Sequence, residues 1–270
     1  MGECSSEFQG RLNAADAMIS EGQFSEALML LETLDMEDPD HPDVVLLTAD
    51  AYFEMGDLET ALDQYDHAVE LDPEWSEAHS DRANCLVEVG KVDEAQADVE
   101  TALRLSPGNA QAHHVRGILL ELAGRHRLAE DAYRTASNLA PDVYFVPFRV
   151  TRKVFDAAVR EAINRLPQEF KTRLAAVEVF VKDLPEATDH PDAPRSPLLL
   201  GAFDGYSITE NTEPSQWTGM PPRIYLYQKN IERVCAHRRD LVREIEITLL
   251  HEVGHYFGME EEDLARVDLK

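Results

Sequence analysis

Cysteine is scarce in this chain, and the three that occur, Cys4, Cys85 and Cys235, are far apart in the sequence. An odd number at such spacing predicts neither a disulfide framework nor a cysteine zinc site. Free thiols are typical of proteins that remain in a reducing compartment. We therefore expect a cytoplasmic protein.

Long apolar runs are also missing from the sequence. No stretch approaches the roughly 20 residues that would span a bilayer. The first residues lack the basic and apolar regions of a signal peptide. We expect a soluble, unexported protein with no membrane partner.

Basic residues are few, and the front half has the fewest. The chain of 270 residues holds 25 Lys and Arg against 52 Asp and Glu. Residues 1–143 hold 8 basic and 31 acidic side chains, a balance of −23, whereas residues 144–270 hold 17 and 21, a balance of −4. So acidic a surface repels phosphate backbones, which argues against a nucleic-acid partner. The uneven charge predicts two different domains, 1–143 and 144–270.

The front half repeats itself with a period of 34 residues over four copies. The recurring residues are Gly22, Gly56, Gly90 and Gly124; Pro39, Pro73, Pro107 and Pro141; and Ala27, Ala61, Ala95 and Ala129. Small side chains let two helices approach closely, glycine suits the turn between them, and proline opens the helix of the next unit. The repeat predicts stacked helical hairpins that form an all-α superhelix.

This period, with its small residues and terminal proline, resembles the tetratricopeptide repeat over about residues 8–143. Tyr65 and Tyr133 stand at the family's aromatic position, and repeat one departs most, with Leu31 and Leu34 at the expected aromatic and alanine. The resemblance implies a concave face, built by the first helix of each hairpin, that holds a protein or peptide segment. Because this half is so acidic, we expect a basic or apolar partner there.

Near the end of the chain, His251-Glu252-Val253-Gly254-His255 forms the motif His-Glu-x-x-His. Residues four apart lie on one face of a helix, so His251 and His255 can present two imidazole nitrogens to one zinc ion. Glu252 points about 100° away around the axis, which suits a carboxylate that holds the attacking water. Leu241, Ile245, Leu249 and Val253 supply a buried face for a helix that begins near Asp240.

A catalytic zinc usually has three protein ligands and one water. Gly258 stands three residues past His255, where it can end the helix and return an acidic run toward the histidines. The compact pattern His-Glu-x-x-His-x-x-Gly-x-x-acid places the third ligand at Glu261. The alternatives are Glu260, Glu262, Asp263 and the upstream His237.

The rest of the back half predicts a small sheet with helices against it. We expect a helix over 151–165, a buried strand over 175–181, a loop over 183–197, strands within 198–208 and 222–228, and a short helix or loop over 229–237.

The segments Leu166-Pro167, Asp183-Leu184-Pro185, Leu200 to Gly205, Pro222 to Tyr227 and HEVGHYFGMEEEDL together resemble the small bacterial zincin-like metallopeptidases, sometimes called minimal zincins. The resemblance covers about residues 148–268 and implies an α+β zincin core. It implies His251, His255 and Glu261 as zinc ligands and Glu252 as the general base.

The leading functional hypothesis is therefore a zinc-dependent metallopeptidase whose repeats recruit a peptide substrate or a protein partner. Tyr206, Tyr225, Tyr227 and Arg223 are candidates for stabilising the oxyanion. The alternative is an adaptor protein, in which the repeats bind partners and the zincin-like domain is inactive or uses zinc structurally.

Overall fold

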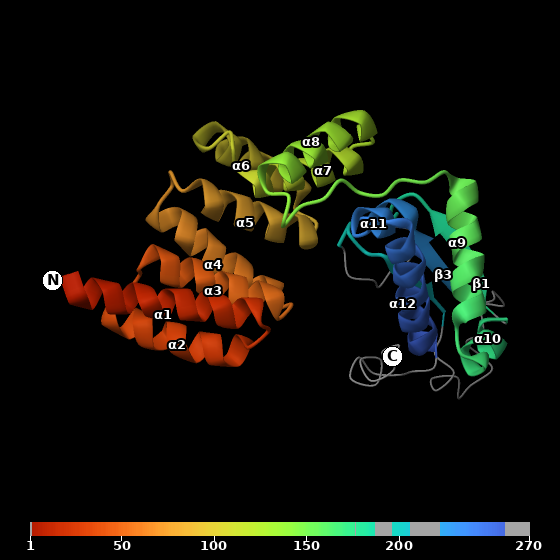
Figure 1. Cartoon of the computed structure of the whole chain (residues 1–270), viewed down its shortest axis with the longest axis horizontal. Helices are drawn as coiled ribbons and strands as arrows, with labels where there is room; N and C mark the ends of the chain where they lie inside the picture. Colours follow the sequence, from red (N-terminus) through yellow and green to blue (C-terminus); the bar gives the residue numbers. More distant parts are fainter. Residues whose placement is uncertain (1, 176, 187–195, 206–221, 257–270) are drawn as a thin grey trace. The chain divides into compact units, whose positions relative to one another are not determined.

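The computed structural model describes residues 2–175, 177–186, 196–205 and 222–256. The chain divides into two compact units, Met1–Phe145 and Val146–Lys270. The first unit contains only helices in its described part, whereas the second combines helices with a sheet (Figure 1). Each unit has its own set of secondary-structure elements and its own hydrophobic core.

The first unit is a row of helical hairpins (Figure 1). Its helices are α1 Gly2–Ser20, α2 Phe24–Glu37, α3 Pro42–Glu54, α4 Leu58–Leu71, α5 Ser76–Glu88, α6 Val92–Leu105, α7 Ala110–Leu122 and α8 His126–Leu139. Consecutive helices pack as pairs, and the first helices of successive pairs also contact one another, α1 with α3, α3 with α5 and α5 with α7. The expectation of stacked hairpins is confirmed.

The recurring glycines occupy the turns inside the hairpins. Gly22, Gly56, Gly90 and Gly124 all adopt positive φ, between 70° and 80°. Side chains with a Cβ rarely take this conformation, which explains why glycine returns at each copy. The proline of the second repeat, Pro73, does not lie at the start of a helix as the sequence predicts. Pro73 lies between the end of α4 and the start of α5 at Ser76, so it terminates one hairpin and does not open the next helix.

The small residues lie where two helices meet. Ala49, Ala61 and Ala68 are fully buried in one cluster with Tyr65. The closest approach is at Gly117 in α7, where an added Cβ would lie 2.5 Å from Cε1 of Tyr133. Overlap of that size would force the helices apart, so the buried tyrosine and the glycine depend on each other.

The second unit is a three-stranded mixed sheet with helices. Its elements are α9 Arg152–Arg165, α10 Gln168–Leu174, β1 Glu178–Lys182, β2 Gly201–Asp204, β3 Arg223–Tyr227, α11 Gln228–Arg233 and α12 Arg238–Tyr256. The strand order is β1-β3-β2, with β1 parallel and β2 antiparallel to β3. In the described ranges, β2 is thus an edge strand. The expected α+β fold is confirmed.

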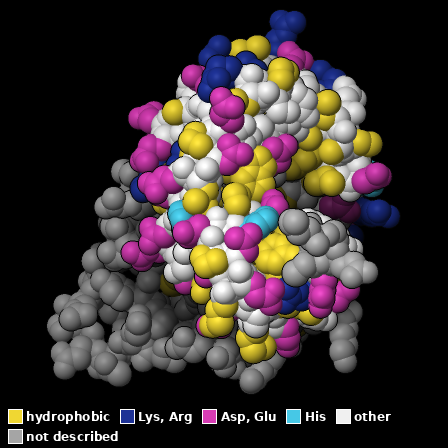
Figure 2. Space-filling view, turned by 90° about the vertical axis from the view of Figure 1, so that its left-hand side faces the viewer, with side chains coloured by type: hydrophobic (Ala, Val, Ile, Leu, Met, Phe, Trp, Pro, Cys, Tyr) yellow, Lys and Arg dark blue, Asp and Glu magenta, His cyan; other side chains and the backbone are white. Residues whose placement is uncertain are grey.

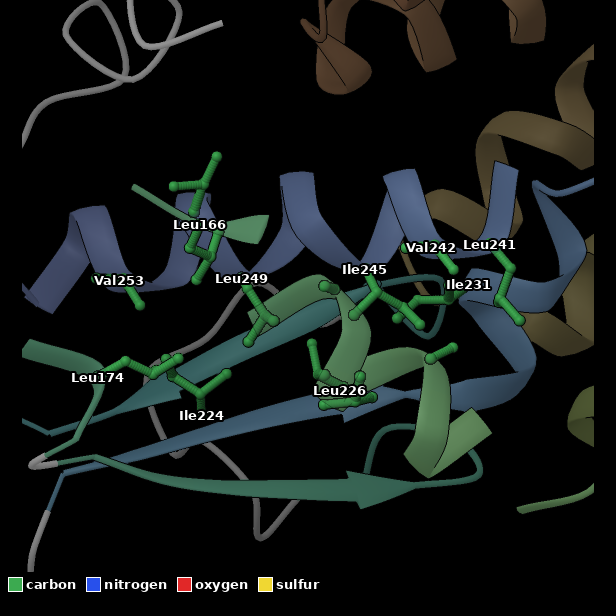
Figure 3. Packing of buried hydrophobic residues seen from close by; sticks show 14 of the residues in the cluster. Leu166, Leu174, Ile224, Leu226, Ile231, Leu241, Val242, Ile245, Leu249 and Val253 are labelled. Carbon is green, nitrogen blue, oxygen red and sulfur yellow. The ribbon is translucent and has the colours of Figure 1, made fainter. Parts of the chain in front are cut away.

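One face of the sheet packs against α9 and α12. Ile224 and Leu226 of β3 share a cluster with Ile245 and Leu249 of α12 (Figure 3). Phe155 of α9 belongs to the same cluster. Burying such side chains contributes about 1.5–3 kcal/mol each. This apolar contact holds the helix that carries His-Glu-x-x-His against the sheet.

Several boundaries differ from the sequence expectation. A helix, α10, occupies 168–174, and the strand begins only at Glu178. The helix that carries the motif begins at Arg238, two residues before Asp240. Asp240 lies in its first turn, where its carboxylate accepts a hydrogen bond from the His237 N–H at 2.8 Å. That bond satisfies a backbone donor at the helix start.

A buried polar helix, α11, fixes the segments around it. The Glu232 side chain is fully buried and accepts hydrogen bonds from the Val150 N–H at 3.1 Å and from Gln228 at 2.7 Å. Asn230, also fully buried, donates to the carbonyls of Pro197 at 2.9 Å and Leu199 at 2.7 Å. The chain entering β2 is therefore anchored by side-chain amide hydrogen bonds.

Within the described ranges, no helix combines the length and the apolar character that a bilayer-spanning segment requires.

Candidate active site

The helix α12 carries His251, Glu252 and His255 near its carboxyl end. His251 and His255 are one turn apart along this helix, as the motif requires. The His251 side chain is half-buried, and Glu252 is 7% exposed. The His255 side chain lies outside the part of the chain that the structure describes.

Glu252 lies against β2 at a position without a side chain. A Cβ atom added at Gly201 would lie 3.1 Å from both Cγ and Oε1 of Glu252, and 2.7 Å from Cγ2 of Thr248. Glycine at this strand position therefore makes room for the carboxylate next to the strand backbone. Thr248 is held in turn by a hydrogen bond from its hydroxyl to the Glu244 carbonyl at 2.8 Å.

Sequence reasoning does not identify Gly201 or Asn230 as residues of the site. Gly201 opens β2, and Asn230 holds two carbonyls just upstream of it. The Tyr227 N–H also donates to the Leu200 carbonyl at 2.9 Å. The signal available in the sequence is a glycine inside a strand pattern, which marks a bulge or a close approach. Only the fold shows that a glutamate makes that approach.

The acidic candidates for a third ligand lie outside the described residues. These are Glu260, Glu261, Glu262 and Asp263, together with the turn residue Gly258. His237 is described, and it precedes α12, whose start is at Arg238. At about 1.5 Å rise per residue, the helix separates His237 from His251 by roughly 20 Å. His237 is therefore excluded as a ligand of the same ion.

Zinc fits the residue types that meet here. Imidazole is a ligand that zinc accepts, and the buried carboxylate of Glu252 beside His251 suits a base that takes a proton from a zinc-bound water. Within the described residues, no three His, Cys, Asp or Glu side chains are close enough to hold a metal ion. The expected set needs the His255 side chain and an acid after Gly258, both outside those residues.

The strand candidates for an oxyanion stabiliser lie on the far face of the sheet. Ile224 and Leu226 face α12, so the alternating residues point the other way. Tyr225 and Tyr227 pack in a separate cluster with Ala202. Arg223 lies two residues before Tyr225 and therefore points to the same face. Its guanidinium lies 5.8 Å from the Phe180 ring centroid. These three thus point away from the face that meets α12, and the fourth candidate, Tyr206, is outside the described residues.

Burial also raises the pKa of a carboxyl group nearer the start of α12. The pKa of Glu244 is raised, mainly because burial disfavours its charged form, and Arg243 partly opposes this rise. Glu246 is buried as well, at 8% exposed. The helix thus carries several acids in a protected environment, and Glu252 is the one beside Gly201 in the described structure.

Comparison with protein families assigns each unit. Residues 174–270 match the family model described as zincin-like metallopeptidase. Two models described as tetratricopeptide repeat match residues 18–85 and 80–142. No curated protein matches the chain in sequence.

Among solved structures, the chain is similar to repeat proteins at low identity. A thermophilic TPR protein from Thermus thermophilus is 20% identical, with a TM-score of 0.47, over 62% of this chain and 87% of that one. The MamA protein is 21% identical, with a TM-score of 0.42, over 52% and 75%. The first TPR of Spaghetti, bound to an HSP90 peptide, is 27% identical, with a TM-score of 0.40, over 44% and 95%. The chain thus consists of tetratricopeptide repeats over residues 18–142, followed by a zincin-like metallopeptidase domain over residues 174–270.

Proposed function

We propose that the chain is a zinc-dependent peptidase that uses Glu252 as general base and His251, His255 and Glu261 as zinc ligands. The observation that carries this proposal is the position of the Glu252 side chain. Its carboxylate is buried at the end of α12 and faces the bare backbone of β2 at Gly201. A buried carboxylate beside a half-buried histidine, at the edge of a sheet, supports this proposal, because a general base must lie next to the ligands of the ion that activates the water.

In this mechanism zinc, when bound, polarises the scissile carbonyl and lowers the pKa of a water molecule. Glu252 accepts the proton of the attacking water and later donates it to the leaving amine. The edge strand β2 pairs with the backbone of an extended substrate through the side that faces away from β3. Since β2 also makes room for Glu252, the same strand aligns the substrate and the base.

The repeats supply the recruiting surface. Asp50 in α3 and Asp81 in α5 lie on neighbouring first helices. The pKa of Asp50 rises to about 6 because it is buried and lies near Asp16 and Glu54. The pKa of Asp81 is also raised, first by burial and then by the charge of Asp50. A cation from a partner would relieve this repulsion, which supports a basic protein segment as the partner of the repeats.

The test is cleavage of an unbiased peptide library by a zinc-loaded sample, read by mass spectrometry. Wild-type protein should cleave a reproducible set of peptides, and Glu252→Gln should lower the rate by about 10³-fold or more because the general base is lost. Glu246→Gln is the matched control, since it changes another buried glutamate of α12. Equal rates for wild type and Glu252→Gln would contradict the mechanism.

The second candidate is an adaptor in which the repeats bind and the zincin-like domain does not cleave. The repulsion that Asp50 exerts on Asp81 favours partner binding whether or not the second unit is catalytic. Partner capture by wild type and by Glu252→Gln, with and without a zinc chelator, separates the two. A complex that persists in all four samples, without cleavage of any peptide, favours the adaptor.

A further inference from the structure

The backbone of β2 has one side turned to β3 and one side turned away from it. The two backbone groups of one residue point to the same side of a strand, and the side alternates from residue to residue. Tyr227 donates its N–H to the Leu200 carbonyl at 2.9 Å, so Leu200 turns its backbone groups toward β3. Gly201, which is opposite Leu226 in the register, therefore directs its N–H and C=O away from β3. In the proposed peptidase these two groups face an extended substrate.

The other edge of the sheet, at β1, is partly occupied. Glu178 donates its N–H to the Pro222 carbonyl at 2.9 Å, so its backbone groups point toward β3. By the same alternation, the Val181 carbonyl points away from β3. Arg152 of α9 donates a hydrogen bond to this carbonyl. Its guanidinium thus takes an acceptor that an added strand would need, which favours strand addition at β2.

The side chain of Asn230 in α11 holds the chain just before Gly201. Asn230 is fully buried, and its amide nitrogen donates to the carbonyls of Pro197 at 2.9 Å and Leu199 at 2.7 Å. The amide oxygen accepts a hydrogen bond from Nη1 of Arg233 at 3.1 Å. Only the NH₂ group can donate to two carbonyls, and only the oxygen can accept from a guanidinium, so the orientation of the amide is fixed. One side chain thus sets the path of the backbone two residues before Gly201.

The helix α11 that carries Asn230 is itself held on two sides. Ile231 is fully buried in the hydrophobic cluster that also contains the apolar face of α12. Glu232 accepts hydrogen bonds from the Val150 N–H at 3.1 Å and from Gln228 at 2.7 Å, and Gln228 donates to the Val150 carbonyl at 3.0 Å. Packing and hydrogen bonds therefore make this short helix a rigid support for the amide. A change at Asn230 should act on the chain that enters β2 rather than on α11.

We infer that Asn230 is a positioning residue for the substrate of the proposed peptidase. It holds the chain that enters β2 so that the backbone groups of Gly201 meet the backbone of an extended peptide in register with Glu252. Asn230 acts through Gly201 and does not touch the substrate. Because this role rests on the proposed function, it exists only if the chain cleaves peptides. Loss of Asn230 should weaken binding more than the chemical step, since His251 and Glu252 stay on α12.

Hydrogen–deuterium exchange of the full chain measures the strand without any substrate. Asn230→Ala removes the donor to the carbonyls of Pro197 and Leu199, so exchange of the backbone amides over 198–204 should become about tenfold faster. Ile231→Val is the matched control, because it removes one methyl group from the core beside Asn230. It should change exchange over 198–204 by less than about threefold. Unchanged exchange in Asn230→Ala would overturn the inference.

A decapeptide tests the link to substrate binding. It is chosen from the peptides that zinc-loaded wild type cleaves in the library, and it contains no Asp or Glu. The repeats carry a balance of −23, and Asp and Glu side chains are spread over the face that Figure 2 shows, so an acidic peptide would be repelled whatever the state of β2. Asn230→Ala should raise KM for this decapeptide about tenfold and change kcat by less than about threefold. Ile231→Val should change neither by more than about threefold.

N-methylation of the decapeptide, one backbone nitrogen at a time, separates lost pairing from general damage. In wild type, methylating the nitrogen that donates to the Gly201 carbonyl should raise KM about tenfold. Methylating the next nitrogen should raise it less than about threefold, because neighbouring N–H groups point to opposite sides. In Asn230→Ala, both methylations should raise KM less than about threefold, whereas Ile231→Val should keep the wild-type difference.

A milder variant covers the case in which Asn230→Ala does not fold. Asn230→Ser keeps one donor in a smaller side chain and should give the same changes at intermediate size. An N-methyl effect as large as that of wild type in either folded variant, or a fall in kcat with unchanged KM, would overturn the inference and leave the peptidase in place. Absence of cleavage by zinc-loaded wild type would contradict the proposed function, and the role of Asn230 with it.

Discussion

The repeats and the zincin-like domain differ in how their structurally important glycines are placed along the sequence. In the repeats, the turn glycines recur every 34 residues with nearly the same φ, so each copy supports the interpretation of the others. In the second unit, Glu252 depends on Gly201, which lies 51 residues earlier and belongs to no repeat. Periodic constraints are visible in a sequence, whereas a unique long-range contact becomes visible only in the fold.

Among variants that keep every proposed catalytic and ligand side chain, the largest effect is expected where the contact between Gly201 and Glu252 is broken. Gly201→Ala puts a Cβ 3.1 Å from Oε1 of Glu252 and 2.7 Å from Cγ2 of Thr248, so the carboxylate must move. Peptide cleavage should fall about 100-fold, because misplacement of a catalytic group by about 1 Å has effects of this size. The measurement is kcat/KM on a peptide that wild type cleaves.

Zinc content and thermal midpoint serve as controls for this variant. Zinc should remain bound, since the substitution leaves the two histidines in place. Full activity in a folded Gly201→Ala variant would show that Glu252 does not need its close contact with β2 at position 201.

The closest helix contact in the repeats gives the next largest effect. Gly117→Ala should destabilise the protein by about 2–3 kcal/mol, because its Cβ would overlap the ring of the buried Tyr133. Gly10→Ala is the matched control. Nothing lies within 4 Å of its added Cβ, and it should stabilise α1 by about 0.5–1 kcal/mol. Denaturant unfolding measures both, and equal effects of the two changes would contradict the close packing of α7 on α8.

The acidic first helices give a pH-dependent effect. The folded-state pKa of Asp50 is raised from 3.8 to about 6, mainly by burial. The folded state therefore holds this proton more tightly than the unfolded state, and stability falls as pH rises from about 4 to 6. Asp50→Asn should be more stable than wild type by roughly 1–2 kcal/mol at pH about 8, and this gain should vanish near pH about 4.

The control for this experiment is Asp63→Asn, which removes the same charge from an exposed site of α4. Unfolding free energies at both pH values decide the outcome. A gain that is equal at the two pH values, or equal for the two variants, would contradict the buried state of Asp50.

A turn glycine gives the smallest effect. Gly56→Ala keeps the hairpin but forces an alanine to φ near +80°, which should cost about 1 kcal/mol. Gly22→Ala should cost a similar amount, since the two turns share their backbone conformation. Thermal unfolding compares both, and an unchanged midpoint in either variant would show that the turn adapts.

Much of the fold follows from the sequence because its rules are local or periodic. Spacing predicts a helix over 151–165, and β-branched and aromatic residues predict a strand within 222–228. The structure has α9 at Arg152–Arg165 and β3 at Arg223–Tyr227. The helix α10 is not predicted, because its seven residues are too few to show a helical period. The helix α12 is predicted to begin near Asp240, whereas it begins at Arg238, and Asp240 in its first turn accepts a hydrogen bond from the His237 N–H.

The site is less accessible to sequence reasoning. The placement of His251 and Glu252 on one helix follows from the motif alone, and the structure has them on α12. The choice between strand residues as oxyanion stabilisers needs the direction of each side chain. That direction depends on which face of β3 meets α12, and Tyr225 and Tyr227 lie on the other face. The roles of His251, His255 and Glu261 as ligands and of Glu252 as general base stay predictions.

The central claim is that His251, His255 and Glu261 hold one zinc ion, and the zinc content of the purified full chain tests it most directly. Mass spectrometry of the metal should find about one zinc per wild-type chain, because a site with three protein ligands retains the ion. His251→Ala, His255→Ala and Glu261→Ala should each lose most of it, whereas His237→Ala, remote from the motif at the other end of α12, should keep it. Wild-type protein without zinc, or retention of zinc in His251→Ala and His255→Ala, would contradict the account.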